Sequence, residues 1–262
     1  MAAKTKSGGG IMETIKTIVY ALLIAGIFRT LFFQPFWIPS GSMKETLLIG
    51  DFLFVNKMAY GYSSHSCPFS MCTFLSDRIL ADEPERGDIV VFKHPVSGAD
   101  FIKRLIGLPG DEIQMRDSVL YINGTAVERV AAGTFVETFE QQGPQRGMPR
   151  CANAPVGIGG ECIKDVYRET LPDGASYDTL DVGVGPYDNT PVYTVPAGHF
   201  FFMGDNRDNS VDSRVPQSAR GVGFVPFANL IGRADRVMFS SAGKSMFYFW
   251  TWRSDRFFKG LE

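Results

Sequence analysis

A single apolar segment near the N-terminus constrains this 262-residue chain more than any other feature. Between residues 17 and 33 the only polar residues are Thr17, Arg29 and Thr30. This is about the shortest length that spans a bilayer as one helix, and Arg29 lies near its end, where the side chain can reach the interface. The overall apolar content of 45% is ordinary for a folded domain, which excludes a protein with several spans.

The residues on either side of the apolar segment predict its orientation. Lys4, Lys6 and Lys16 precede it, which favours a cytoplasmic N-terminus with the bulk of the chain outside. A cleavable secretory signal is the alternative, but the segment is long for one and ends in bulky residues at 32–37 instead of small ones. The aromatic residues at this end fit the interfacial belt of a spanning helix.

Charge and cysteine content narrow the function classes. The net charge is -2, and no block of Lys and Arg indicates nucleic-acid binding. The four cysteines allow three pairings, and the local pairs Cys67–Cys72 and Cys151–Cys162 are the simplest for an exported domain. A zinc site is not expected, because the three histidines have no metal-ligand spacing relative to the cysteines.

Short apolar runs bounded by turn residues dominate the chain after the apolar segment. They predict strands at 51–56, 88–93, 101–106, 118–122, 199–203 and 236–239. Asn123-Gly124 after one of these runs is a strong hairpin signal. Helical periodicity over ten residues is not apparent in this part, so we expect a mainly β fold with an antiparallel sheet as its core.

Composition predicts how the chain is divided. A stretch rich in Gly, Pro, Asp and Thr lies between two strand-rich parts, which indicates an inserted β-rich cap subdomain. We therefore expect a cytoplasmic tail at 1–14, a transmembrane helix at 15–35, a β core formed by 36–126 and 197–262, and the cap at 127–196. The aromatic run at 246–252 could be buried core or a lipid-contacting edge, and its density of large rings favours membrane contact.

Pro-Ser-Gly-Ser-Met at 39–43 would present a serine hydroxyl close to the bilayer surface. A serine hydroxyl is inert at neutral pH without an adjacent base, so Ser42 needs a partner. The usual base would be histidine, but none of His65, His94 and His199 is convincingly placed. Each is more simply interpreted as a structural or surface residue.

Lys103 is the stronger candidate for the base. Strand alternation places it on the same face as Phe101 and Leu105. Burial among apolar side chains would penalise the charged form and lower the pKa of the lysine amine, which could then accept the serine proton. The plainer alternative is an exposed strand lysine. Arg104 would point to the opposite face and pair with a carboxylate.

A polar loop at 204–214 follows the predicted strand at 199–203. Its aspartates could bind calcium, but the loop lacks the spacing and terminal Glu of an EF-hand, and Arg207 in its middle opposes a cation. A network of Asp/Arg pairs around Ser210 is the more plausible arrangement, and it would support a catalytic group rigidly.

Five segments, in order and after an apolar anchor, resemble the consecutive boxes of bacterial type I signal peptidases, a Ser/Lys dyad serine protease family. They are 39–47, 50–57, 86–92, 103–111 and 204–214. One departure is visible, since the family usually has Pro where this chain has Glu45. That change could alter the rigidity or charge of the loop after the nucleophile, but it leaves the serine and the lysine untouched.

The resemblance implies a role for each matching residue. Ser42 would attack the scissile carbonyl, and Lys103 would act as general base and then protonate the leaving amine. The Ser42 backbone N–H and the Ser40 hydroxyl would form the oxyanion hole, and Ser210 would hydrogen-bond and orient Lys103. Ion pairs bracing the site would come from Arg104, Asp205, Asp212 and Arg214. Shallow pockets for small side chains would be lined by Ile38, Met43, Leu47, Phe101 and Ile102.

The function implied is that of a membrane-bound serine endopeptidase. It would remove N-terminal signal peptides from exported preproteins after small-x-small motifs, through an acyl-enzyme, with no metal or organic cofactor. Its partners would be signal-peptide-bearing preproteins and membrane lipid, not nucleic acid. We expect a single-pass protein of the bacterial inner (cytoplasmic) membrane with its catalytic domain on the periplasmic or outer face.

Two other functions fit the same features. One is a related dyad protease with a dedicated substrate, such as a conjugation-pilus maturation peptidase, which a panel of unrelated precursors would distinguish. The other is a non-enzymatic, membrane-tethered β domain, in which Ser42→Ala and Lys103→Ala would leave cellular activity intact.

Overall fold

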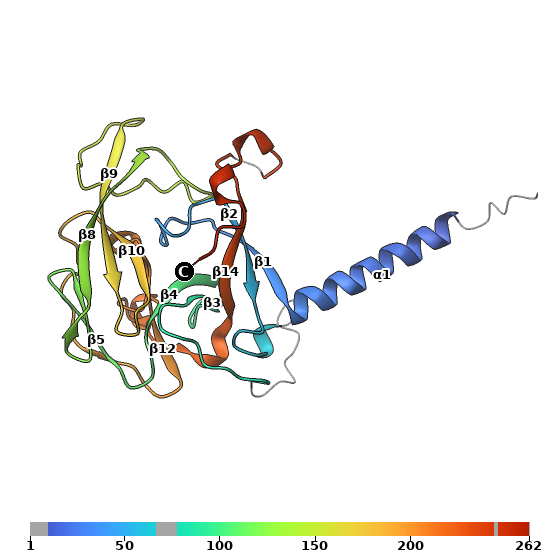
Figure 1. The fold of residues 1–262 in the computed structure, drawn as a ribbon, viewed down its shortest axis with the longest axis horizontal. Coiled ribbons are helices and arrows are strands. Elements are labelled where there is room, and N and C mark those ends of the chain that lie inside the picture. Colours follow the sequence, from blue (N-terminus) through green and yellow to red (C-terminus); the bar gives the residue numbers. More distant parts are fainter. Residues whose placement is uncertain (1–9, 67–77, 244–245, 262) are drawn as a thin grey trace, which may run out of the picture.

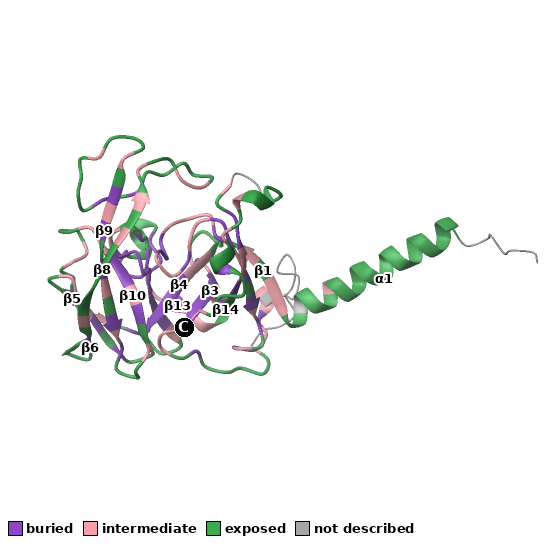
Figure 2. Cartoon of the chain, turned by 45° about the horizontal axis from the view of Figure 1, so that its top comes forward, coloured by how far each residue is buried: buried purple, intermediate pink, exposed green. Residues whose placement is uncertain are grey.

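The computed structural model describes residues 10–66, 78–243 and 246–261 of the chain. One helix, α1 (Gly10–Leu31), projects from a β-rich body (Figure 1). Its stretch Gly10–Arg29 is long and apolar enough to cross a membrane, and it is exposed almost throughout (Figure 2). The helix begins before the predicted 15–35, at Gly10, and it ends at Leu31 because the chain is already extended in β1 (Phe33–Trp37).

The body is built on a seven-stranded antiparallel sheet. In spatial order its strands are β1, β2 (Asp51–Asn56), β14 (Leu230–Ser240), β3 (Ile89–Lys93), β4 (Asp100–Gly107), β12 (His199–Met203) and β13 (Val225–Pro226). The apolar runs of the sequence form β2, β3, β4 and β12 as predicted. The strand predicted at 236–239 is longer than expected, since its first half alternates polar residues such as Arg233 with buried ones such as Ala234.

Two smaller antiparallel sheets complete the body. One has the order β10 (Ser176–Asp181), β9 (Glu161–Thr170), β8 (Glu128–Thr138), and the other β11 (Tyr193–Thr194), β5 (Glu112–Arg116), β6 (Val119–Ile122), β7 (Thr125–Ala126). Asn123 and Gly124 join β6 to β7 with φ of 52° and 77°, as a two-residue hairpin turn requires. Short 3₁₀ turns lie at Ser64–Ser66, Arg207–Asn209, Gln217–Ala219, Phe227–Asn229, Phe249–Thr251 and Ser254–Arg256. The expected mainly β fold behind one apolar helix is confirmed.

The predicted cap shares its hydrophobic core with the rest of the body. Leu171 and Tyr177 from the cap region pack in one cluster with Phe201 and Met203 of β12. β11 also lies within 127–196 but pairs with β5. The two regions therefore form different sheets but share one hydrophobic core. Figure 2 shows buried strands in both.

The cap region contains one disulfide, Cys151–Cys162, which confirms one of the two simple pairings. The other predicted pair, Cys67–Cys72, lies outside the described residues. The aromatic run near the C-terminus is on the surface, with Phe247, Phe249 and Trp250 each at least two-thirds exposed. Of the two interpretations of this run, buried core is therefore wrong.

Removing the cap disulfide should destabilise the protein. The bond joins cysteines 11 residues apart, and cross-linking a loop of this length stabilises a fold by about 3 kcal/mol. We expect Cys151→Ser/Cys162→Ser to lower the free energy of unfolding by about that amount, measured by urea unfolding of the full-length protein in detergent. The adjacent exposed pair Ala152→Ser/Glu161→Ser should change it by less than about 0.5 kcal/mol. Equal stability of the two double variants would contradict the expectation.

Candidate active site

Ser42 lies in the loop between β1 and β2, and backbone hydrogen bonds close the base of this loop. Ile38 N–H donates to the Asp51 carbonyl and Gly50 N–H to the Ile38 carbonyl, both at 2.9 Å. Met43 and Leu47 are buried in the apolar cluster beneath the loop, which fixes its position against the sheet. Ser42 itself is only 9% exposed.

Lys103 on β4 meets Ser42 across the sheet surface. Its Nζ lies 2.7 Å from Ser42 Oγ and 2.9 Å from the Ile102 carbonyl oxygen, and is hydrogen-bonded to both. The amine lies 5.4 Å from the centre of the Phe101 ring, so strand alternation placed it as predicted. The lysine is 3% exposed, which rules out the alternative of an exposed strand lysine.

Burial sets the chemistry of this lysine. Loss of hydration penalises its charged form and lowers its pKa to about 8, while the charges of Asp212 and Asp205 oppose the shift. A lysine with this pKa is partly neutral close to physiological pH, and only the neutral amine can accept a proton from the serine. The pair therefore has both the geometry and the electrostatics of a nucleophile and its base.

The loop at 204–214 holds the serine loop from the side. Asn206 donates from its backbone N–H to the Ser42 carbonyl at 3.1 Å and from its side chain to the Gly41 carbonyl at 2.8 Å. Gly204 permits this close approach, since a Cβ there would lie 2.5 Å from the Ser42 carbonyl oxygen. Sequence reasoning missed Asn206, although it lies within one of the boxes.

The four charged residues expected to brace the site form two buried ion pairs. Arg104 meets Asp205 through two nitrogens at 2.8 and 2.9 Å, on the face of β4 opposite Lys103. Arg214 contacts Asp212 at 2.8 Å. The first pair links the polar loop to β4, and the second lies within the loop. This agrees with the predicted network of Asp/Arg pairs.

Ser210 differs from the expectation. The described partners of the Lys103 amine are Ser42 and the Ile102 carbonyl, and Ser210 is not among them. The Ser210 hydroxyl is buried close to Asp212, without a hydrogen bond of normal geometry to any described residue. The expected bond from Ser210 to Lys103 is therefore not formed.

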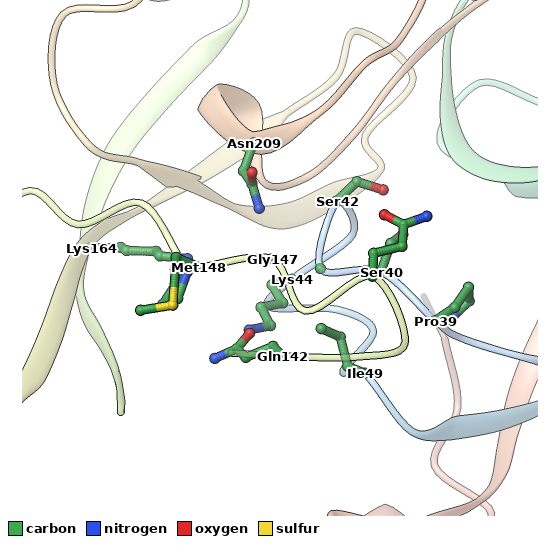
Figure 3. A pocket seen from close by; sticks show the side chains of 13 residues that line it. Pro39, Ser40, Ser42, Lys44, Ile49, Gln142, Gly147, Met148, Lys164 and Asn209 are labelled. Atoms are coloured by element: carbon green, nitrogen blue, oxygen red, sulfur yellow. The ribbon is translucent and has the colours of Figure 1, made fainter. Parts of the chain in front are cut away.

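Three of the residues expected to line substrate pockets are core residues in this structure. Ile38, Met43 and Leu47 are at most 2% exposed and belong to one apolar cluster, and Ile102 packs against its edge. Phe101 packs against a different cluster and lies beside Lys103. Ser40, expected in the oxyanion hole, lines a cavity of about 170 Å³ together with Ser42 (Figure 3).

His94 stabilises a turn, and the described residues include no group suited to hold a metal ion. His94 is buried, and its Nδ1 accepts hydrogen bonds from the N–H groups of Val96 and Ser97, which stabilises a turn. In the ranges that the structure describes, no group of three or more His, Cys, Asp and Glu side chains is placed to hold a metal ion. The base found beside the Ser42 hydroxyl is Lys103.

Sequence reasoning also missed a second lysine near the nucleophile. Lys44 is 5% exposed, and its amine contacts the Glu137 carboxylate and donates to Gln142 Oε1 at 2.7 Å. Burial lowers the pKa of Lys44, and the adjacent Glu137 opposes this. Lys44 was visible in the sequence beside the serine, but its partners come from the cap, which local patterns could not place.

A serine hydroxyl bonded to a buried lysine amine on a β scaffold is the arrangement of a Ser/Lys serine hydrolase. Residues 11–239 match the model of the family described as signal peptidase, peptidase S26. The chain therefore belongs to this family and is a serine endopeptidase.

Two relatives named signal peptidase I agree with this assignment. The chain is 40% identical to a signal peptidase I of Rickettsia typhi over 90% of its own length and 83% of the relative, and 41% identical to that of Rickettsia prowazekii over 88% and 81%. A solved signal peptidase I from Enterococcus faecalis is 28% identical to the chain. The match has a TM-score of 0.30 and covers 58% of this chain and 97% of the solved one.

The pKa of Lys103 predicts how activity depends on pH. The neutral amine is the active form and predominates above about 8, so kcat/KM should rise about tenfold per pH unit below that value and level off above it. The measurement is kcat/KM for an Ala-x-Ala peptide from about pH 6 to about pH 10. A rate that is flat, or that falls as the pH rises through this range, would contradict a lysine base.

Asp212 should contribute to the midpoint of that profile. Its charge raises the pKa of Lys103, so Asp212→Asn should move the midpoint to lower pH, whatever fraction of the variant is active. Asp255→Asn, which removes an exposed carboxylate, serves as the control and should leave the midpoint in place. An unchanged or higher midpoint in Asp212→Asn would show that this charge does not act on the base.

Proposed function

We propose that this protein cleaves signal peptides from exported preproteins with Ser42 and Lys103 as its catalytic dyad. The observation that carries the proposal is the 2.7 Å contact between the serine hydroxyl and a buried lysine amine whose pKa is lowered to about 8. The names of relatives about 40% identical to this chain supply the substrate class.

In the proposed reaction Ser42 Oγ attacks the carbonyl carbon of the scissile bond while neutral Lys103 takes its proton. The resulting ammonium donates that proton to the departing amine, which leaves an ester between the signal peptide and Ser42. Lys103, neutral again, then activates a water that hydrolyses the ester and releases the signal peptide. The backbone N–H of Ser42 and the Ser40 hydroxyl would bind the oxyanion, and each donor of this kind is worth about 3 kcal/mol.

Strand pairing suggests where the substrate binds. β12 pairs with β4 only through Arg104, Leu105 and Gly107, so on that side residues 100–103 have no strand partner among the described residues. An extended peptide can add there, ending beside Lys103, with alternate side chains on one face. Shallow apolar pockets around Ile38 and Ile102 would then accept only small side chains, which accounts for small-x-small cleavage motifs.

The remaining polar residues would position the dyad. The Arg104–Asp205 pair would fix the polar loop against β4, the Asp212–Arg214 pair would brace the loop internally, and Asn206 would fix the serine loop.

The helix α1 would hold the enzyme at the membrane in which its substrates are embedded, and this raises their effective concentration. The lysines at the N-terminus favour a cytoplasmic tail at 1–14 and an anchor in the bacterial inner membrane. The core at 36–126 and 197–262 and the cap at 127–196 would then lie on the outer face. The exposed aromatic run at 246–252 is suited to contact lipid.

Replacing either member of the dyad should abolish cleavage. We expect Ser42→Ala and Lys103→Ala to reduce kcat for an Ala-x-Ala precursor by at least about 1,000-fold. Matched exposed residues, Ser176→Ala and Lys259→Ala, should retain wild-type turnover. The measurement is cleavage by full-length protein in detergent, with circular dichroism to compare folding.

Turnover that persists in either dyad variant would reject the proposed mechanism. A panel of unrelated precursors tests the substrate class, since a maturation peptidase with a dedicated substrate would cleave one and spare the others. A protein without enzymatic activity would cleave none.

A further inference from the structure

The cavity beside Ser42 is lined on one side by residues that have no role in the proposed reaction. One side is the serine loop, and the opposite side comes from the cap, including Gln142, Met148 and Lys164 (Figure 3). At about 170 Å³ it is smaller than a typical pocket for a drug-sized ligand, about 300–1,000 Å³, and it suits one amino-acid side chain. The cavity is partly open, so a side chain of a bound substrate can enter it.

The walls of the cavity carry an excess of positive charge. Lys44 and Lys164 both line it, and both ammonium groups meet the single carboxylate of Glu137, that of Lys164 at 2.6 Å. The pKa of Glu137 is depressed, since these two lysines outweigh its burial, and the carboxylate is therefore ionised at neutral pH. Arg253 adds a further positive charge near Lys44.

These lysines are buried: Lys44 is 5% exposed and Lys164 is 1% exposed. A buried cation without a full counter-charge is costly, and an anion entering the cavity would reduce that cost. The rest of the lining includes apolar side chains such as Ile49 and Met148, which fit the methylene groups of an acidic residue. The site therefore favours a carboxylate on a short aliphatic stem.

We propose that this cavity binds an acidic side chain, Asp or Glu, that follows the scissile bond of the substrate by one to three residues. The inference rests on the proposed function, since it assigns the cavity to the chain that Ser42 cleaves. It adds a specificity determinant in the mature part of the preprotein to the small residues required before the cleavage point.

The position of the cavity places the acidic residue after the bond. None of the five residues expected to contact the segment before the bond, Ile38, Met43, Leu47, Phe101 and Ile102, lines this cavity. An extended chain advances about 3.3 Å per residue, so the residues that pass the cavity beside Ser42 are the first few beyond the scissile carbonyl.

A peptide is a better occupant than a lipid phosphate. In Figure 1 the helix α1 leaves the body next to β1, on the side opposite the cap strands β8 and β9. The cavity lies between the serine loop and the cap. The substrate chain, in contrast, must pass Ser42.

The test uses wild-type enzyme and a peptide series. Each peptide carries the same Ala-x-Ala site, with Glu, Gln or Lys at the first, second or third position after the bond, and further peptides carry Glu, Gln or Lys at the middle position before it. Because Glu and Gln have the same shape, their difference reports charge. We expect kcat/KM to be about tenfold higher for Glu than for Gln at one position after the bond, and lower still for Lys.

Variants of Lys164 then connect the preference to the cavity. Lys164→Gln should reduce the ratio of kcat/KM for Glu over Gln to near one, while Lys164→Arg, which keeps the charge, should preserve it. Lys259→Gln, an exposed lysine outside the site, is the matched control and should keep the wild-type ratio.

Each other outcome overturns the inference. Equal cleavage of the Glu, Gln and Lys peptides by wild type shows that no anion site exists, while the proposed function stands. A preference that survives in Lys164→Gln places the responsible charge elsewhere, and a preference only before the bond contradicts the placement. If wild type cleaves none of the peptides, the proposed function fails as well.

Discussion

The site depends on one desolvated amine, that of Lys103, and this explains much of how the surrounding residues are arranged. Lys103 must lose water to become a base near neutral pH, yet a buried cation is unstable wherever it stays charged. Asp205 and Asp212 moderate that penalty without contacting the amine directly. Their own charges are in turn neutralised by Arg104 and Arg214, so the pKa of the lysine is set by a balance of burial and paired charges.

The serine loop has to match this buried amine, and it is held from two directions. The polar loop holds it through Asn206, which bonds the carbonyls of Gly41 and Ser42. The cap holds it through Lys44, which contacts Glu137. The region at 127–196 therefore contributes to the site, and it shares a hydrophobic cluster with β12.

Sequence patterns predicted several strands of the seven-stranded sheet and missed β8 and β9 of the cap. β2, β3 and β12 were predicted from apolar runs, and β4 from a run that is interrupted by the buried Lys103 and Arg104. β9 was not, because two of its buried positions are Lys164 and Glu169. A pattern of hydrophobicity cannot identify such a strand, since the ion pairs that make its burial possible come from other elements.

The sequence by itself determined the apolar helix and the mainly β body, and its resemblance to signal peptidases pointed to Ser42, Lys103 and the residues of the two buried ion pairs. Strand alternation added that Lys103 lies beside Phe101 and that Arg104 lies on the other face. Only the tertiary structure decided the partners of Lys44, which lie up to 98 residues away, and the direction of the Lys103 amine toward Ser42 instead of Ser210. Such contacts depend on how distant strands pack, and no local pattern records that packing.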